Sequence, residues 1–298
     1  MGEAAALLSA LCWATTSVAL ARLGATYSGA MLSGLRFLIA SPFVIALLVV
    51  TGGVAGILSG SWAPILIVVL SAGVNYGIGD TLYVGALPRI GLQRMAPTTT
   101  ALWVAFSTLG GVLILGEPAS VNLVLGAALV IAGTYLVVAA RIEDLPNASR
   151  PQRPSPLATL LVMLAVAGSW SASTLLIAGG RGDLDAIAVS AIRIPAGGVL
   201  IAAVLLVTTR GEVLHRLPQP RDLPLVIAVG ILGTALGGLA YIYAVAEAGA
   251  ARAVILNSTS PLMVVPLAIA FLGERPTRRV ALGTVCCLAG TLSVVVAG

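Results

Sequence analysis

The chain has 298 residues, of which 59% are hydrophobic and only 9% are charged. A typical soluble domain has about 25% charged residues, and a disordered chain needs low hydrophobicity, so both classes are excluded. All 16 basic residues are arginines that form no cluster, which excludes a basic nucleic-acid-binding patch. The remaining class is a membrane protein that crosses the bilayer several times. At roughly 20 residues per span, the length is sufficient for about ten helices.

Ten apolar runs have the length of a membrane-spanning helix. They are residues 3–23, 30–51, 63–86, 94–115, 120–140, 157–179, 186–208, 222–246, 253–272 and 277–297. A transmembrane barrel would need alternating segments of about ten residues, and the sequence has none. The predicted fold class is therefore an all-α membrane protein with ten transmembrane helices.

A polar segment, residues 141–156, divides the chain into two halves of five helices, residues 1–140 and 157–298. A shift of 157 residues brings these halves into register. It pairs Trp13 with Trp170, Arg36 with Arg193, Glu117 with Glu274 and Gly126 and Gly133 with Gly283 and Gly290, and a one-residue slip then pairs Tyr83 with Tyr241. Because five is odd, the second half must cross the membrane in the opposite sense. The sequence thus predicts two inverted-topology repeats, an arrangement typical of secondary transporters.

The arginines also predict an orientation. Twelve of the 16 lie in the loops that follow predicted helices 1, 3, 5, 7 and 9. The positive-inside rule assigns these loops to the cytoplasm and both termini to the outside of the inner (plasma) membrane.

Three charged residues lie inside predicted helices: Arg36, Arg193 and Asp80. A charge at membrane depth costs about 2.5–3.5 kcal/mol on insertion scales. One interpretation is that an arginine attracts a substrate carboxylate and that Asp80 binds a proton or an ammonium group. The alternative is structural: the arginines cap carbonyls, or an Arg–Asp pair holds the helices together.

Aromatic residues form a second group of candidates. Trp13, Trp103 and Trp170 lie near the middles of predicted helices, where an indole N–H needs a polar partner. With Tyr76, Tyr83 and Tyr241, they are expected to line a central cavity. The alternative is that they are large core residues.

Polar residues near prolines form a third group. Thr99 lies two residues after Pro97, and Asn257 and Ser258 precede Pro261. Proline frees a helical carbonyl, and freed backbone groups build midplane sites in carriers. Alternatively, the hydroxyl groups only satisfy the kink; Asn75 is a similar case.

Glycines at helical spacing predict close packing. Gly126 and Gly133 share one face, as do Gly283 and Gly290, so predicted helix 5 is expected to pack on helix 10 within the chain. The spacing of Gly73 and Gly77 is interpreted in the same way.

Enzyme activity is not expected. His215 is the only histidine, which excludes an HExxH metal site, and the absence of lysine excludes a phosphate-binding P-loop. The three cysteines lie in apolar runs and suit neither a disulfide framework nor a metal site. We therefore expect no cofactor and no metal.

The stretch from Asn257 to Thr277, with Gly283 and Gly290, resembles the second EamA repeat of the drug/metabolite transporter superfamily. Gly116-Glu117-Pro118 ends a weaker first copy, and Trp13 and Arg36-Phe37 also fit the family pattern. The resemblance implies a carrier of 5+5 inverted repeats that exports amino acids or related metabolites with the help of an ion gradient.

The predicted function is a secondary transporter that exports a small amphipathic metabolite by alternating access. Its partners would be the solute and the lipid bilayer, with proton coupling through Asp80 as a hypothesis, in a monomer or a homodimer. The alternatives are a passive facilitator or channel and a non-transporting scaffold or receptor.

Overall fold

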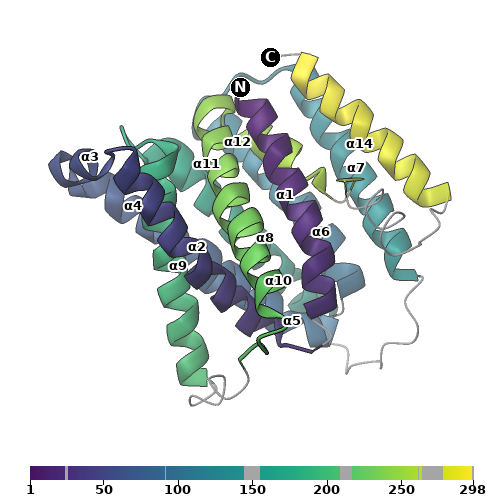
Figure 1. Cartoon of the computed structure of the whole chain (residues 1–298). Coiled ribbons are helices and arrows are strands. Elements are labelled where there is room, and N and C mark those ends of the chain that lie inside the picture. The colour runs from purple at the N-terminus through teal and green to yellow at the C-terminus, as the bar shows by residue number, and fades with distance from the viewer. Residues whose placement is uncertain are drawn as a thin grey trace.

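Every secondary-structure element in the described part of the chain is a helix. The computed structural model describes residues 1–23, 26–90, 92–143, 155–208, 217–260, 262–263 and 278–296, and no strand occurs in these ranges. The helices form a bundle in which the start of the first helix and the end of the last lie at the same end (Figure 1). The predicted all-α class is confirmed.

The elements follow the predicted apolar runs closely. In the first half they are α1 (Gly2–Leu23), α2 (Gly29–Val50), α3 (Val54–Ser59), α4 (Trp62–Ala72), η1 (Gly73–Asp80), α5 (Thr81–Ile90), α6 (Leu92–Leu113) and α7 (Val121–Glu143). In the second half they are α8 (Pro156–Gly180), α9 (Ala186–Thr208), α10 (Leu223–Ala228), η3 (Val229–Leu236), α11 (Gly237–Ala248), α12 (Ala250–Asn257) and α14 (Arg278–Val296). The short helix α3 lies in a segment that was expected to be a loop.

Two predictions fall largely outside the described residues. The polar linker is described only at its edges, up to Glu143 and from Ser155 on. The predicted run 253–272 begins earlier than expected, at Ala250, and its first helix ends at Asn257. Pro261 and Glu274 lie outside the described residues. The division of the chain at the linker therefore stays a prediction.

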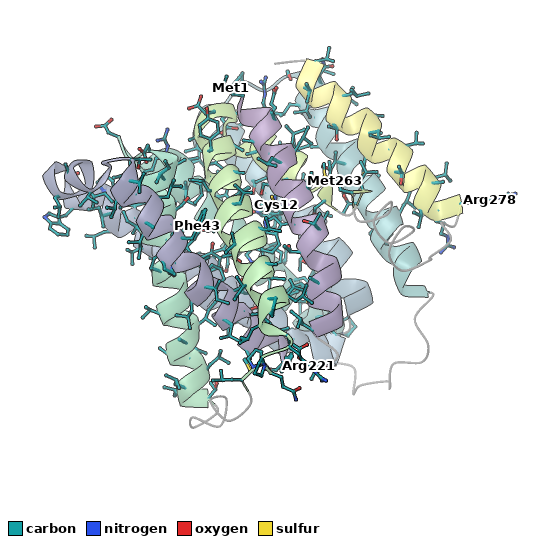
Figure 2. All side chains as sticks on the ribbon, viewed as in Figure 1. Met1, Cys12, Phe43, Arg221, Met263 and Arg278 are labelled. Carbon is teal, nitrogen blue, oxygen red and sulfur yellow. The ribbon has the colours of Figure 1, made fainter. Side chains whose placement is uncertain are left out.

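Six described helices are long and apolar enough to cross a membrane. They are Met31–Val50, Trp62–Tyr83, Pro156–Gly180, Ala186–Thr208, Leu223–Ala248 and Arg278–Val296, and shorter apolar helices cover Thr98–Leu113 and Val121–Leu136. Large apolar side chains on these helices face outward: Phe43 on α2, labelled in Figure 2, is 41% exposed. The described helices support a multi-pass membrane protein, whereas the number ten and the inverted repeat stay predictions.

Two of the long helices contain a π-helical segment, which the sequence analysis did not predict. The segment η1 lies between α4 and α5, and η3 lies between α10 and α11. Under the proposed 157-residue register, the two segments nearly coincide. A π-helical turn widens the helix and re-aims its side chains, and such turns are frequent at functional sites. In this chain, η1 carries three candidate site residues, Asn75, Tyr76 and Asp80.

Helix α7 packs along α14, and glycines make the close approach possible (Figure 1). A Cβ atom added to Gly133 would lie 2.6 Å from both the Gly283 carbonyl oxygen and the Cys287 sulfur. One added to Gly290 would lie 2.8 Å from the carbonyl oxygen of Gly126. The predicted packing of these four glycines inside the chain is confirmed. Among the described residues, a Cβ atom at Gly77 would lie 2.6 Å from the Leu200 side chain, whereas one at Gly73 would meet nothing within 4 Å, so the same prediction is confirmed for Gly77 and wrong for Gly73.

We expect Gly133→Ala to lower the apparent melting temperature of the detergent-solubilised protein, because the added methyl group meets the backbone of α14. The matched control is Gly168→Ala on α8, where an added Cβ meets nothing within 4 Å. An alanine in an open helical position removes the entropic cost of glycine, about 1 kcal/mol, so this variant should be as stable as the parent or more stable. Equal melting temperatures for the two variants would contradict the packing argument.

Glu117 connects the two halves at one end of the bundle. It lies between α6 and α7, and its two carboxylate oxygens accept hydrogen bonds from the backbone N–H groups of Ala250, at 2.5 Å, and Ala251, at 3.0 Å. These groups begin α12, where the first N–H groups of a helix have no partner within the helix. Gly249 precedes them with a φ of 84°, in the left-handed region. Glu117 is thus the N-terminal cap of a helix far along the chain.

We expect Glu117→Ala to destabilise the protein by about 1–2 kcal/mol, the usual cost of losing an N-cap. The melting temperature of the solubilised protein measures this effect. Glu247→Ala, a nearby exposed position at the end of α11, is the control and should leave the melting temperature unchanged. If Glu117→Ala behaved like the control, the cap would have no energetic role.

Candidate functional site

Asp80 is the last residue of η1, and two side chains from other helices approach its carboxylate. The indole Nε1–H of Trp170, on α8, donates a hydrogen bond of 2.9 Å to Oδ1. The Arg36 Nη2 atom, on α2, lies 3.9 Å from Oδ2. A Cβ atom at Gly79 would lie 2.8 Å from the Trp170 ring, so glycine at this position permits the indole to approach. These contacts join the two halves of the chain at a charged group.

Arg36 lies between aromatic rings as well as beside Asp80. Its Cζ atom is 5.0 Å from the centre of the Trp13 ring on α1 and 5.2 Å from that of Phe37. A guanidinium within about 6 Å of a ring centre is attracted to the electron-rich ring face. The Arg36 side chain is only 11% exposed, so these partners replace water around its charge. The observed pair with Asp80 is the structural alternative that the sequence analysis left open.

Arg193, the predicted counterpart of Arg36, has a different environment. It is 5% exposed, its Cζ atom lies 4.8 Å from the Tyr76 ring centre, and its Nη2 atom donates to the Ser173 Oγ atom at 2.9 Å. Ser173 in turn donates to the Ser71 carbonyl at 2.8 Å. Gly197, on the same helix as Arg193, leaves the space that the Tyr76 ring fills. The described residues include no carboxylate within salt-bridge distance of Arg193.

The remaining aromatic candidates extend this arrangement. Trp170 packs against Tyr83, with ring centres 5.4 Å apart, and against Trp103, at 6.2 Å. Trp103 also lies 6.2 Å from Tyr241, whose hydroxyl is 2.8 Å from that of Thr174. We call the connected set the polar–aromatic cluster; it consists of Trp13, Arg36, Phe37, Tyr76, Asp80, Tyr83, Trp103, Trp170, Ser173, Thr174, Arg193 and Tyr241.

Four of the residues predicted for the site are not among these members of the polar–aromatic cluster. Asn75 lies half-buried on η1. The Thr99 hydroxyl donates to the Met95 carbonyl at 2.6 Å, and the Ser258 hydroxyl donates to the Ile255 carbonyl at 2.8 Å. Both bonds go to a carbonyl three or four residues earlier in the chain, as the kink-satisfying alternative expects. The Oδ1 atom of Asn257 is buried and has no hydrogen-bond partner among the described residues.

Sequence reasoning missed Ser173 and Thr174, which link α8 to Arg193 and Tyr241. One signal was present: the 157-residue shift pairs Ser173 with Thr16, another hydroxyl residue three positions after a mid-helix tryptophan. Hydroxyl residues are common in membrane helices, however, and most of them bond to their own helix. The sequence did not distinguish these two from the rest.

The chemistry available in the polar–aromatic cluster is binding chemistry. It offers two guanidinium groups, one carboxylate, hydroxyls and several aromatic faces. The described residues contain no group of three His, Cys, Asp or Glu side chains arranged to hold a metal ion. Such a set suits recognition of a small polar solute with an apolar body.

Comparisons with known proteins agree on the family. The model of the EamA-like transporter family matches residues 1–139 and, a second time, residues 157–296. No curated protein matches the chain. Among solved structures, 27 chains match. One of them, a protein crystal structure with 20% sequence identity, aligns with 99% of this chain and with 96% of the other chain's length, with a TM-score of 0.82. At that identity the likeness concerns the fold alone, whereas the family model spans nearly the whole sequence, and the chain therefore belongs to the EamA-like transporter family.

Proposed function

We propose that this protein is a secondary transporter that exports small amphipathic metabolites, such as amino acids or related solutes. The observation that carries the proposal is the polar–aromatic cluster itself. Two arginines and an aspartate in helices of membrane-spanning length are costly, and such residues usually mark a substrate or ion pathway. The cluster draws on both halves of the chain, where carriers with internal repeats form their sites.

The proposed mechanism is alternating access by ten helices in two inverted five-helix repeats. Two features support it: the family model matches the chain twice, and π-helical segments lie in both halves near the same repeat position. Widened turns next to the cluster are suitable places for helices to bend. Rocking of one half against the other would expose the cluster to each side of the membrane in turn.

We also propose that the protein resides in the inner (plasma) membrane and that both of its termini lie on the side away from the cytoplasm. Figure 2 shows Met1 and Arg221 at opposite ends of the bundle. Arg221 belongs to one of the arginine-rich loops that the positive-inside rule assigns to the cytoplasm. The N-terminus at the other end is consistent with this orientation.

Counterflow in proteoliposomes tests the proposed transport. Vesicles containing the full chain and loaded with one unlabelled solute should accumulate the same labelled solute transiently, and a screen of amino acids, sugars and quaternary amines covers the main classes. Protein-free vesicles are the control. Exchange without accumulation under an imposed gradient would indicate a passive facilitator, and the absence of flux for all solutes would indicate a scaffold or receptor.

We propose Asp80 as the proton-coupling residue, because it is the one carboxylate in the cluster and lies between Arg36 and Trp170. Asp80→Asn should abolish accumulation driven by a pH gradient while counterflow, which needs no net proton movement, continues. Glu3→Gln is the control, since Glu3 forms its ion pair with Arg252 at a helix start. If Asp80→Asn kept gradient-driven accumulation, Asp80 would be excluded as the coupling site.

A further inference from the structure

Three buried hydrogen-bond donors in the polar–aromatic cluster have no partner among the described residues. They are the Nε atoms of Arg36 and Arg193 and the Nε1 atom of Trp103. A guanidinium or an indole N–H donates only and cannot accept. A buried donor without a partner costs about 1–3 kcal/mol, so each such group in a native structure needs an explanation. Acceptor atoms of a bound solute are one such explanation.

The charges of the cluster point the same way. Its two guanidinium groups are accompanied by one carboxylate, that of Asp80, so the described residues leave one positive charge in excess. This carboxylate lies beside Arg36, whose Nη2 atom is 3.9 Å from the Asp80 Oδ2 atom. Arg193 is 5% exposed, and its described hydrogen-bond partners are the neutral hydroxyls of Ser173 and Tyr76. A buried charge of this kind is strongly stabilised by an anion.

An ammonium group would find fewer partners in the cluster. The Oδ1 atom of Asp80 accepts from Trp170, and the charge of this carboxylate is already offset by Arg36. An amine would have to compete with both. The aromatic faces attract cations, but the rings of Trp13, Phe37 and Tyr76 already contact guanidinium groups.

From these observations we infer that the cluster binds a monoanion, a solute with one carboxylate and an apolar body, in preference to the zwitterion or the amine of the same skeleton. The carboxylate would accept hydrogen bonds from Arg193 and Trp103, and the apolar body would pack on the aromatic rings. This inference rests on the proposed function, since it names the solute class for the same site.

Two matched series of ligands test the inference by isothermal titration calorimetry on the full chain in detergent. The first series is isocaproate, leucine and isoamylamine, and the second is hydrocinnamate, phenylalanine and phenethylamine. Within each series the side chain is constant and the net charge at neutral pH changes from −1 to 0 to +1. We expect each acid to bind about tenfold or more tightly than its amino acid and its amine, since one charge-assisted hydrogen bond is worth about that factor.

Variants then locate the binding. Trp103→Phe keeps an aromatic ring and removes the N–H donor, so we expect it to weaken binding of both acids about tenfold. Its matched control is Trp62→Phe at the exposed start of α4, where Trp62 is 74% exposed. Arg193→Gln should abolish the preference for the acids, whereas Arg221→Gln, whose side chain is 75% exposed in the parent, should preserve it.

The results separate this inference from the proposed function. The inference is overturned if an amino acid or amine binds as tightly as its acid, or if no acid binds, in which case water satisfies the donors. It is also overturned if Trp103→Phe binds the acids as the parent does. If the acids bind as expected but no solute shows counterflow, the binding inference stands and the transport proposal fails. If other solutes show counterflow and the acids do not bind, the transport proposal stands and the inference fails.

Discussion

The central constraint on this structure is the need to keep two guanidinium charges inside helices that are otherwise apolar. Arg36 is stabilised by Asp80 and by the ring of Trp13, and Asp80 is held by Trp170 from the other half of the chain. Removing one partner of a buried ion pair leaves an uncompensated charge, which costs more than the pair contributes. The two halves are therefore tied together at the place where the candidate site lies.

The same contacts depend on close approach between backbones and large rings. Gly79 leaves space for the Trp170 ring, and Gly197 leaves space for the Tyr76 ring. Away from the site, Gly133 lets α7 approach α14. On the π-helical segment η1, Tyr76 contacts Arg193 and Asp80 lies beside Arg36. Small residues thus leave room for the rings that take part in the polar contacts.

Much of the candidate site was visible in the sequence for one reason. A charged residue or a tryptophan in the middle of an apolar run must find a polar partner, so Arg36, Asp80 and Trp170 were recognisable without a structure. Thr99 and Ser258 were chosen on weaker grounds, and their hydroxyls bond to carbonyls three or four residues earlier in the chain. The capping role of Glu117 was not predicted, because its partners, the first N–H groups of α12, lie more than a hundred residues away.

The sequence by itself determined the fold class and the family. Hydropathy decides which segments avoid water, and within the bilayer the backbone of such a segment must form its own hydrogen bonds, so helices follow from composition. Only the tertiary structure decided the partners. Trp170 and Asp80 are 90 residues apart, and whether they meet depends on how α8 packs against η1, which hydropathy does not specify. Packing also decided that Arg36, and not Arg193, lies within salt-bridge distance of a carboxylate among the described residues, although the charges of both arginines interact with Asp80.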